Sequence, residues 1–331
     1  MKVDISVRAY RRTFREPMRT AHGQWQTREG FIVRLESDGA VAFGEVAPIS
    51  DFGTETVARA AEFLRQWAAD PIILPSGLPC CHFALTSAMQ QLSQPPAPPL
   101  RDYAVAGLLP AGRPALAAAQ KKLAAGYTSL KWKIGVLAAE AEQEILMELL
   151  GLLPKQVSLR LDANGGMDRN CAESWLALLS EHPEQVAYLE QALPPGEEAA
   201  MADLARDWGI PIALDESLNL PGRERWLTPG AWSGPLVVKP LLMGNLTLLC
   251  EQLKPLATQL VFSSVFETGI GLAQALSLAD LLPASKLAIG FDTVAAFDDD
   301  LSGCPAGPVI AAESRAQMDL EALWKQLPPL I

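Results

Sequence analysis

Three observations predict the fold class of this chain: an α/β protein in which an N-terminal α+β capping domain precedes a (β/α)8 barrel of the TIM type. Residues 1–50 alternate between apolar and polar side chains, as strands with one buried face do. The proline-rich stretch 93–99 cannot continue a helix and indicates a linker. Beyond it, short apolar runs alternate with helical patterns, which is typical of β-α units around a parallel sheet.

The capping domain is predicted to contain an antiparallel sheet followed by two helices. Asp38 and Gly39 form a turn between its last two strands, and the pattern from Glu55 to Asp70 predicts a helix. The apolar face of that helix consists of Val57, Ala60, Ala61, Leu64 and Ala68. The predicted strands are 3–10, 30–37 and 40–46, and the second predicted helix is 81–92. We expect this domain to span 1–98, joined by the C-terminal segment 315–331.

The barrel is predicted from eight short apolar runs, separated by segments that suit crossover helices. These runs are 103–110, 129–135, 157–164, 186–193, 210–217, 235–243, 259–267 and 286–293. We expect the barrel domain to span 99–314. The competing architecture is an open doubly wound sheet, which requires a glycine-rich phosphate turn after its first strand. Only a loose pair, Gly107 and Gly112, is found there, so the barrel is favoured.

Composition and charge narrow the class of partner. With 49% hydrophobic and 20% charged residues, the composition is that of a globular protein. The net charge of −11 argues against nucleic acid, because phosphate binding depends on clustered lysine and arginine. We find no apolar stretch long enough to span a membrane and no secretion signal. Five scattered cysteines fit reduced thiols, so we expect a cytoplasmic protein, either a monomer or a homo-oligomer.

Three acidic residues stand at the ends of three successive predicted strands: Asp162, Glu190 and Asp215. Because the strands of a parallel barrel all end at one mouth, we expect these carboxylates to converge there. Oxygen ligands without histidine or cysteine select Mg²⁺ or Mn²⁺ over zinc. Taken singly, each acid could instead cap a helix or form a loop salt bridge. The three together predict a divalent metal site.

Lysines lie on both sides of these acids. Lys131 and Lys133 share one face of their strand, because side chains alternate, and Lys239 follows a later apolar run. An exposed strand end would explain the first pair, but carboxylates on the next three strands favour an inward position. A lysine beside another ammonium and a metal has a lowered pKa and can act as a base. Together with the metal, such a group can remove a proton next to the carboxylate of a small-molecule substrate.

These residues belong to longer motifs. The segments KWK, LDAN, EQALPP, LDES, VVKP and FSSVFETGIG resemble the enolase superfamily, in the subgroup with lysines on both sides that includes muconate cycloisomerases. Within it the chain is most similar to the o-succinylbenzoate synthase family, through the segments RTAHGQWQTREGFIVRL, GEVAPI, RLDANGGM and GFDTVAAF. The resemblance covers nearly the whole chain and implies an enolase-like capping domain and barrel.

The resemblance also implies a role for each group. Lys133 would remove the α-proton and then protonate the departing hydroxyl, while Lys131 tunes it and helps to hold the substrate carboxylate. Lys239 would stabilise the enediolate from the opposite face. The implied ligands of Mg²⁺ are Asp162, Glu190 and Asp215. The implied reaction, that of a hydro-lyase, is dehydration of 2-succinyl-6-hydroxy-2,4-cyclohexadiene-1-carboxylate to 2-succinylbenzoate, a step towards menaquinone or phylloquinone.

Further residues near the mouth are candidates for binding the substrate. Ser263 and Ser264 end the seventh predicted strand, where they could bind a carboxylate or satisfy backbone groups. Gly269 and Ile270 open the next helix, whose free N–H groups can bind an anion. Arg160 is expected inside the barrel, and a salt bridge to the acids is as plausible there as substrate contact.

The cap contributes a loop that contains Arg19 and His22, between two predicted strands. In relatives such a loop closes over the substrate, and the resemblance implies substrate contact here. A solvated loop with a surface histidine is the alternative. Trp25 could line the cap side of the pocket or belong to the core.

Rival functions remain open. A racemase or epimerase acting on N-acylamino acids or dipeptides would use both lysines as bases. Dipeptide epimerases usually carry Asp-x-Asp near the end of the eighth strand, and the stretch 291–294 lacks the second aspartate. A cycloisomerase acting on muconate is a further rival. A non-catalytic binding barrel would be expected to lack one metal ligand or one lysine, yet all six are present.

Overall fold

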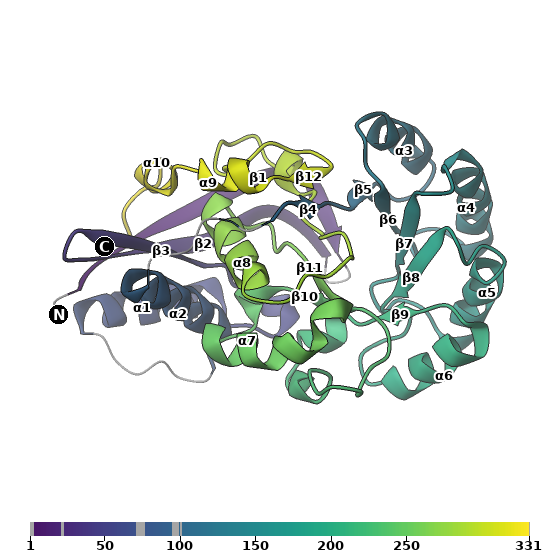
Figure 1. Cartoon of the computed structure of the whole chain (residues 1–331), viewed down its shortest axis with the longest axis horizontal. Coiled ribbons are helices and arrows are strands. Elements are labelled where there is room, and N and C mark those ends of the chain that lie inside the picture. The colour runs from purple at the N-terminus through teal and green to yellow at the C-terminus, as the bar shows by residue number, and fades with distance from the viewer. Residues whose placement is uncertain (1–2, 21–22, 71–76, 95–98, 100, 331) are drawn as a thin grey trace.

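The computed structural model describes residues 3–20, 23–70, 77–94, 99 and 101–330. Its N-terminal strands are β1 (Asp4–Thr20), β2 (Gly23–Ser37) and β3 (Ala40–Val46). They form the predicted antiparallel sheet in the order β1-β2-β3 (Figure 1). Between β2 and β3, Asp38 and Gly39 take φ values of 51° and 80°, the left-handed geometry that a type I′ hairpin turn requires.

Two helices, α1 (Val57–Ala69) and α2 (Pro79–Ser93), pack against this sheet. The buried face of α1 consists of Ala60, Ala61, Phe63, Leu64 and Trp67. Val57 and Ala68, also predicted for this face, are half-buried at its border. The predicted linker 93–99 falls mostly outside the described residues.

The described part of the chain contains a closed barrel of eight parallel strands, which confirms the predicted fold class. Seven of these strands carry labels: β5 (Gly107–Leu109), β6 (Ser129–Lys133), β7 (Ser158–Asp162), β8 (Val186–Glu190), β9 (Ile212–Ala213), β10 (Leu236–Val238) and β11 (Leu260–Phe262). The eighth is the short segment at Ile289 and Gly290, and β4 (Tyr103–Ala104) precedes β5 but pairs antiparallel with a C-terminal strand. The strands β5 to β9 form one sheet in chain order, and β10 pairs with β11. Isolated parallel bridges complete the circle, pairing Leu214 with Leu236, Ser263 with Gly290, and Val105 with Ile289.

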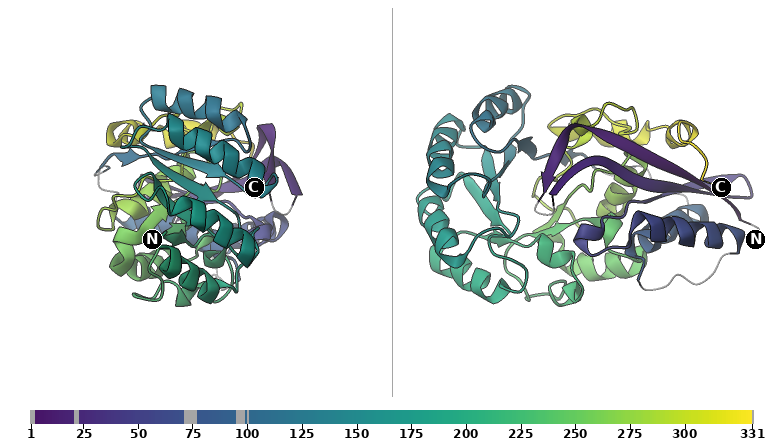
Figure 2. Two further views of the ribbon diagram at one scale, coloured as in Figure 1. Left: turned by 90° about the vertical axis from the view of Figure 1, so that its right-hand side faces the viewer. Right: turned by 180° about the vertical axis from the view of Figure 1, so that it is seen from behind.

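Helices cover the outside of the barrel (Figures 1 and 2). They are α3 (Pro114–Ala124), α4 (Ala139–Leu152), α5 (Arg169–Leu179), α6 (Glu198–Trp208), α7 (Leu246–Leu253) and α8 (Gly269–Asp280). The crossover from β9 to β10 is built differently, with two 3-10 turns at Glu216–Leu218 and Arg223–Arg225. Most side chains of α8 are buried, because this helix lies between the barrel and β3 of the cap.

The C-terminal segment returns to the cap sheet. It contains β12 (Val309–Ile310), α9 (Ala312–Ala316) and α10 (Leu320–Lys325). β12 pairs with β4, and the last residues run beside β1, where the Leu330 N–H donates to the Val7 carbonyl at 2.9 Å. Arg8 donates to the carbonyl oxygens at the end of α10. The boundaries predicted at 98/99 and 314/315 stay predictions.

A buried carboxylate joins the cap to the barrel. Glu45 of β3 is 0% exposed and accepts hydrogen bonds from the N–H groups of Thr268 and Gly271 at the start of α8. The hydroxyl of Tyr10 donates to the same carboxylate at 2.8 Å. Negative charge at a helix N-terminus is stabilised by the helix dipole and the free N–H groups. Glu45 therefore fixes α8 to the cap sheet.

Two buried arginines of the β1-β2 hairpin add to this junction. Arg12 binds the Asp299 carboxylate at 2.9 Å and the Glu267 carbonyl oxygen at 2.7 Å. Arg28 donates to the Val265 carbonyl oxygen at 2.9 Å. Asp299, in the acidic run 298–300, is therefore a partner of a buried cation. The hairpin is held to the loops that follow the last two barrel strands.

Candidate active site

Lys133 and two of the predicted acids form a row across three neighbouring barrel strands. In the parallel register, Lys133 on β6 stands opposite Asp162 on β7, which stands opposite Glu190 on β8. Each of the three residues ends its strand and so lies at the C-terminal mouth. Trp132 points outward and packs against Trp175 of α5, with the ring centres 6.5 Å apart. Because side chains alternate, the lysines face inward, as predicted.

Ammonium groups hold all three carboxylates. The Nζ of Lys131 lies 2.8 Å from Asp162 Oδ2 and 2.7 Å from Glu190 Oε1. On the opposite side, Lys239 forms an ion pair with Asp215. The acids are buried, with exposures of 7%, 1% and 4% in chain order. Among the described residues, no three His, Cys, Asp or Glu groups surround one point as metal ligands do. The carboxylates turn towards the lysines instead.

Burial and mutual repulsion decide the charge of this cluster. Burial and the charges of Asp162 and Asp215 raise the pKa of Glu190 well above its ordinary value. Burial opposes ionisation of Asp215 as well, but Lys239 and Lys131 outweigh it, so the pKa of Asp215 is lowered.

At Lys131, burial and the neighbouring carboxylates also act on the pKa in opposite directions. Burial lowers its pKa, yet Asp162, Glu190 and Asp215 outweigh burial and raise the pKa well above its ordinary value. Lys131 behaves in this way because its direct partners are carboxylates. Three buried carboxylates that draw ammonium groups to themselves form a donor set suited to a divalent cation.

Amide side chains support the acids, and they were not predicted. Gln191 is 0% exposed and accepts from the Asp215 N–H at 3.0 Å. Asn164 donates to Asp162 Oδ1 at 2.9 Å, and Asn219 donates to Asp215 Oδ1 at 3.2 Å. Gln191 and Asn164 take positive φ values of 39° and 47°, which non-glycine residues rarely adopt outside constrained sites. The sequence does contain a signal for these residues, because an asparagine or glutamine follows each acid by one to four positions.

Arg160 lies inside the barrel below the row of acids. It is 2% exposed and stands beside Lys131 and Tyr188 in the strand register. Its Cζ lies 5.2 Å from the centre of the Tyr188 ring, a cation–π contact. Among the described residues, no ion pair joins Arg160 to the acids, so the salt-bridge alternative is not what this structure has. Contact between Arg160 and substrate stays a prediction.

The cap reaches the mouth through Phe52. The Nζ of Lys239 lies 5.0 Å from the centre of the Phe52 ring, and the ring of Trp25 lies 5.9 Å from that of Phe52. The indole N–H of Trp25 donates to Asp51 at 3.3 Å. Trp25 is half-buried and packs against the hydrophobic core as well as against Phe52, so its lining of the pocket stays a prediction.

The two serines at the end of β11 differ. The Ser264 hydroxyl donates to the Glu267 carboxylate at 2.9 Å and accepts from the Phe266 N–H at 2.9 Å. It satisfies groups of its own loop, as the simpler alternative expected. Ser263 is half-buried and faces Gly290, where an added Cβ would lie 2.9 Å from Ser263 Oγ. Substrate contact by Ser263 stays a prediction.

The prediction that N–H groups of Gly269 and Ile270 bind a substrate anion is wrong. The Gly269 N–H donates to the Leu301 carbonyl at 2.7 Å, and the Ile270 N–H donates to the Thr268 hydroxyl at 3.2 Å. Glu45 is the anion that this helix N-terminus binds. A carboxylate more than 200 residues away in sequence leaves no signal in the local pattern.

Two predicted substrate contacts lie in the cap hairpin. His22 lies outside the described residues. The backbone of Arg19 belongs to β1 and pairs with Gln24 of β2. Contact of Arg19 and His22 with substrate stays a prediction.

Two family profiles match this chain, one in the cap and one in the barrel. The profile "MenC, N-terminal domain" matches residues 8–92, and "Enolase C-terminal domain-like" matches residues 115–233. An o-succinylbenzoate synthase from Thermosynechococcus vestitus is 37% identical over 298 residues, covering 86% of this chain and 91% of the relative. The chain belongs to the o-succinylbenzoate synthase family. Another member, from Photorhabdus laumondii, is 31% identical over 85% of this chain and 88% of its own length.

Solved structures agree with this assignment. The o-succinylbenzoate synthase of Thermosynechococcus elongatus, complexed with Mg in its active site, is 32% identical and has a TM-score of 0.81. The match covers 98% of this chain and 100% of that one. An N-succinyl Arg/Lys racemase from Bacillus cereus has a TM-score of 0.72 at 17% identity, covering 99% and 98% of the two chains. The second likeness shows the shared enolase-superfamily fold alone.

Asp292, which follows the eighth barrel strand, binds groups other than the acids and lysines at the mouth. The Asp292 carboxylate accepts from the Leu108 N–H at 2.7 Å and the Tyr127 hydroxyl at 2.9 Å, and it pairs with Lys122. Tyr127 follows α3, and Lys122 belongs to it. Asp292 therefore ties the end of the eighth strand to the first β-α unit.

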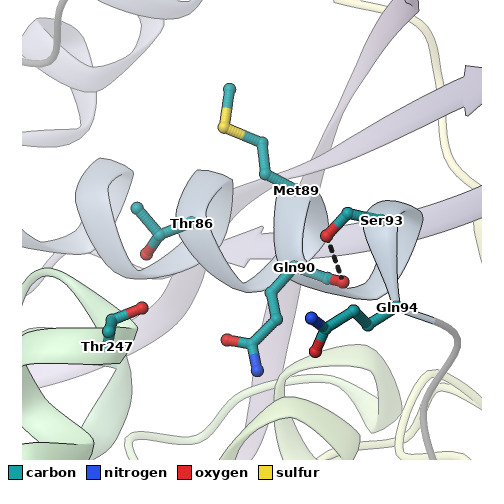
Figure 3. Close-up of a pocket in the computed structure, with 6 residues that line it drawn as sticks. All are labelled: Thr86, Met89, Gln90, Ser93, Gln94 and Thr247. Atoms are coloured by element: carbon teal, nitrogen blue, oxygen red, sulfur yellow. Dashed lines mark hydrogen bonds between the residues drawn. The ribbon is translucent and has the colours of Figure 1, made fainter.

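A separate pocket lies between α2 and α7, outside the barrel mouth (Figure 3). Its volume is about 470 Å³, and none of the predicted site residues lines it. The lining residues are Thr86, Met89, Gln90, Ser93, Gln94 and Thr247. This open, polar hollow has none of the paired acids and lysines of the barrel.

The buried carboxyl group of Glu267, beside Ser264, is expected to make the stability of the fold depend on pH. Burial is the main cause that raises the pKa of Glu267 from 4.5 to about 7, with Glu45 adding to it. Between these values the folded chain keeps a proton that the unfolded chain has lost, so stability falls as the pH rises through this window. We expect the free energy of unfolding to lose about 3 kcal/mol from this group between pH 5 and 8. Urea unfolding of wild type and Glu267→Gln checks this: an equal pH dependence in both would contradict it.

Proposed function

We propose that this chain dehydrates 2-succinyl-6-hydroxy-2,4-cyclohexadiene-1-carboxylate to 2-succinylbenzoate, in the biosynthesis of menaquinone or phylloquinone. The observation that carries the proposal is the placement of lysines on opposite sides of three buried carboxylates, in a member of this family. The five cysteines are free, which supports the expected cytoplasmic location.

The acids supply the ligands that Mg²⁺ or Mn²⁺ prefers. The ligands would be Asp162, Glu190 and Asp215, which are carboxylates without a neighbouring thiolate or imidazole ligand in the described cluster. When bound, the ion supplies positive charge beside the substrate carboxylate while electrons move onto that group. Lys131 and Lys239, which hold these acids here, would then be released to face the substrate.

The lysines transfer the substrate proton and stabilise the negative charge that its loss creates. Lys133 takes the proton from C1 of the ring, and the electron pair of that bond moves onto the carboxylate. The same pair then forms the C1–C6 double bond as hydroxide leaves C6, and the proton on Lys133 converts it to water. Lys131 would hold the carboxylate near Lys133, and Lys239 would stabilise the enediolate from the far side. Aromatisation drives the step forward.

Local charge suits a dianionic substrate despite the acidic chain. Four cations, Lys131, Lys133, Arg160 and Lys239, lie in or at the barrel beside the three acids and Glu216. A bound divalent ion makes the mouth more positive, and charge-lined sites raise the local concentration of an opposite ion.

Turnover by the purified protein with Mg²⁺ tests the proposal. We expect the diene absorbance of the substrate to be replaced by that of 2-succinylbenzoate, with multiple turnovers per molecule. A folded, Mg²⁺-loaded protein that leaves this substrate unchanged would overturn it.

Racemisation of N-succinylamino acids is the second candidate, because Lys133 and Lys239 lie on opposite sides of the acids. Two bases on opposite faces are what racemisation requires. Exchange of the α-proton in D₂O, followed by NMR, separates the two activities. Complete absence of exchange removes the racemase.

A further inference from the structure

The segment between β6 and α4, residues 134–138, is buried only at its start, where Ile134 is 1% exposed. Its side chains Val136 and Leu137 are 43% and 50% exposed, although both are apolar. Gly135 takes φ = 77°, the left-handed geometry that glycine tolerates best. Burial of side chains therefore fixes Ile134 but does not explain how residues 135–138 keep one conformation.

A single buried carboxylate holds the segment. Glu142, in the first turn of α4, is 0% exposed. It accepts hydrogen bonds from the N–H groups of Gly135, Val136 and Leu137 at 2.7, 3.0 and 3.0 Å. In the described part of the chain, no lysine or arginine forms an ion pair with Glu142. Its charge is compensated by three charge-assisted bonds to backbone, the strong kind.

The backbone that Glu142 binds begins two residues after Lys133 in the chain. Ile134, immediately after the lysine, donates its N–H to the Asp162 carbonyl at 2.9 Å. The backbone after Lys133 is thus fixed to β7 by one bond and to α4 by three. A displacement of about 1 Å in a reacting group can reduce a rate by about 100-fold.

We propose that Glu142 is a positioning residue that keeps Lys133 Nζ aligned with the α-carbon of the substrate. The inference rests on the role proposed for Lys133. Glu142 does not touch the substrate and acts through the backbone of 135–137. Neutralising it leaves part of the N–H cluster without an acceptor and lets the start of the segment move.

A matched carboxylate elsewhere separates positioning from stability. Glu55 of the cap is 4% exposed and accepts from the N–H groups of Cys80 and Cys81 at 3.2 and 2.9 Å. It resembles Glu142 in burial and in partners, but it holds the start of α2. Removing either carboxylate leaves buried N–H groups unsatisfied, which destabilises the fold.

The experiment compares Glu142→Gln and Glu55→Gln in the Mg²⁺-loaded protein. We expect both to lower Tm. Glu142→Gln alone lowers kcat, by about 10- to 100-fold, while KM and the stoichiometry and Kd of 2-succinylbenzoate binding by calorimetry stay unchanged. An unchanged kcat, a fall matched by loss of binding stoichiometry, or an equal fall in Glu55→Gln would overturn the proposal.

Two further measurements keep the test decisive. If Glu142→Gln does not fold, Glu142→Asp, which keeps the charge on a shorter side chain, is expected to lower kcat at least about 3-fold with unchanged product binding. An unchanged kcat in Glu142→Asp would then overturn the inference. Failure of the proposed function is distinguished because the wild type itself would not turn over, or because Lys133→Ala would stay active.

Discussion

Lys133→Ala is expected to reduce kcat by about 10³- to 10⁴-fold, the upper part of the range for loss of a general acid/base. The lysine ends β6 directly opposite Asp162, so its side chain lies at the barrel mouth beside the acids. An alanine leaves no group there to take the C1 proton. The same substitution also removes the acid that converts the departing hydroxide to water, so both halves of the dehydration are lost.

The measurement is steady-state turnover of the cyclohexadiene substrate, with Mg²⁺ binding followed by calorimetry to show that the site is intact. Lys121→Ala, on the exposed side of α3, serves as the matched control and should change kcat less than about 2-fold. Undiminished turnover by Lys133→Ala, with the metal bound, would remove the proposed mechanism.

The barrel and its acid row were predictable because their signals are local. A β-α unit leaves an apolar run followed by an amphipathic segment, and the last residue of such a run is a position at the mouth. Asp162 and Glu190 follow that rule, and their strands pair in the register that brings them together. The residue types then limit the chemistry.

What the sequence did not indicate depends on partners far away in the chain. Gly269 has the local pattern of an anion-binding helix start, but Glu45 from β3 occupies that position. Asp299 lies in an acidic run typical of a solvated loop, yet Arg12 of β1 binds it. Gln191 holds the Asp215 backbone across two strands. Each of these contacts is set by how the cap packs on the barrel or how strands neighbour one another.

Removing the divalent ion is expected to abolish turnover without unfolding the chain. Dialysis against EDTA should lower kcat to background, and Mg²⁺ or Mn²⁺ should restore it, because positive charge beside the substrate carboxylate is needed as electrons move onto it. The fold should persist, since Lys131 and Lys239 pair with the acids in this structure. Circular dichroism and Tm measure the fold, and atomic absorption measures residual metal. Full turnover in protein free of detectable metal would contradict the metal role.

Glu190→Gln tests whether a single carboxylate is needed to bind the divalent ion. Glu190 is 1% exposed and lies between Asp162 and Asp215 in electrostatic reach of both, so its loss removes the central carboxylate of the three. We expect Mg²⁺ affinity by calorimetry to fall at least about 10-fold, with turnover falling in parallel. Glu198→Gln is the control, because Glu198 is buried nearby but binds the Gly196 N–H instead. If Glu190→Gln bound Mg²⁺ as tightly as the wild type, the ion would have to be held by other groups, and the three strand ends would be structural salt-bridge partners of Lys131 and Lys239 only.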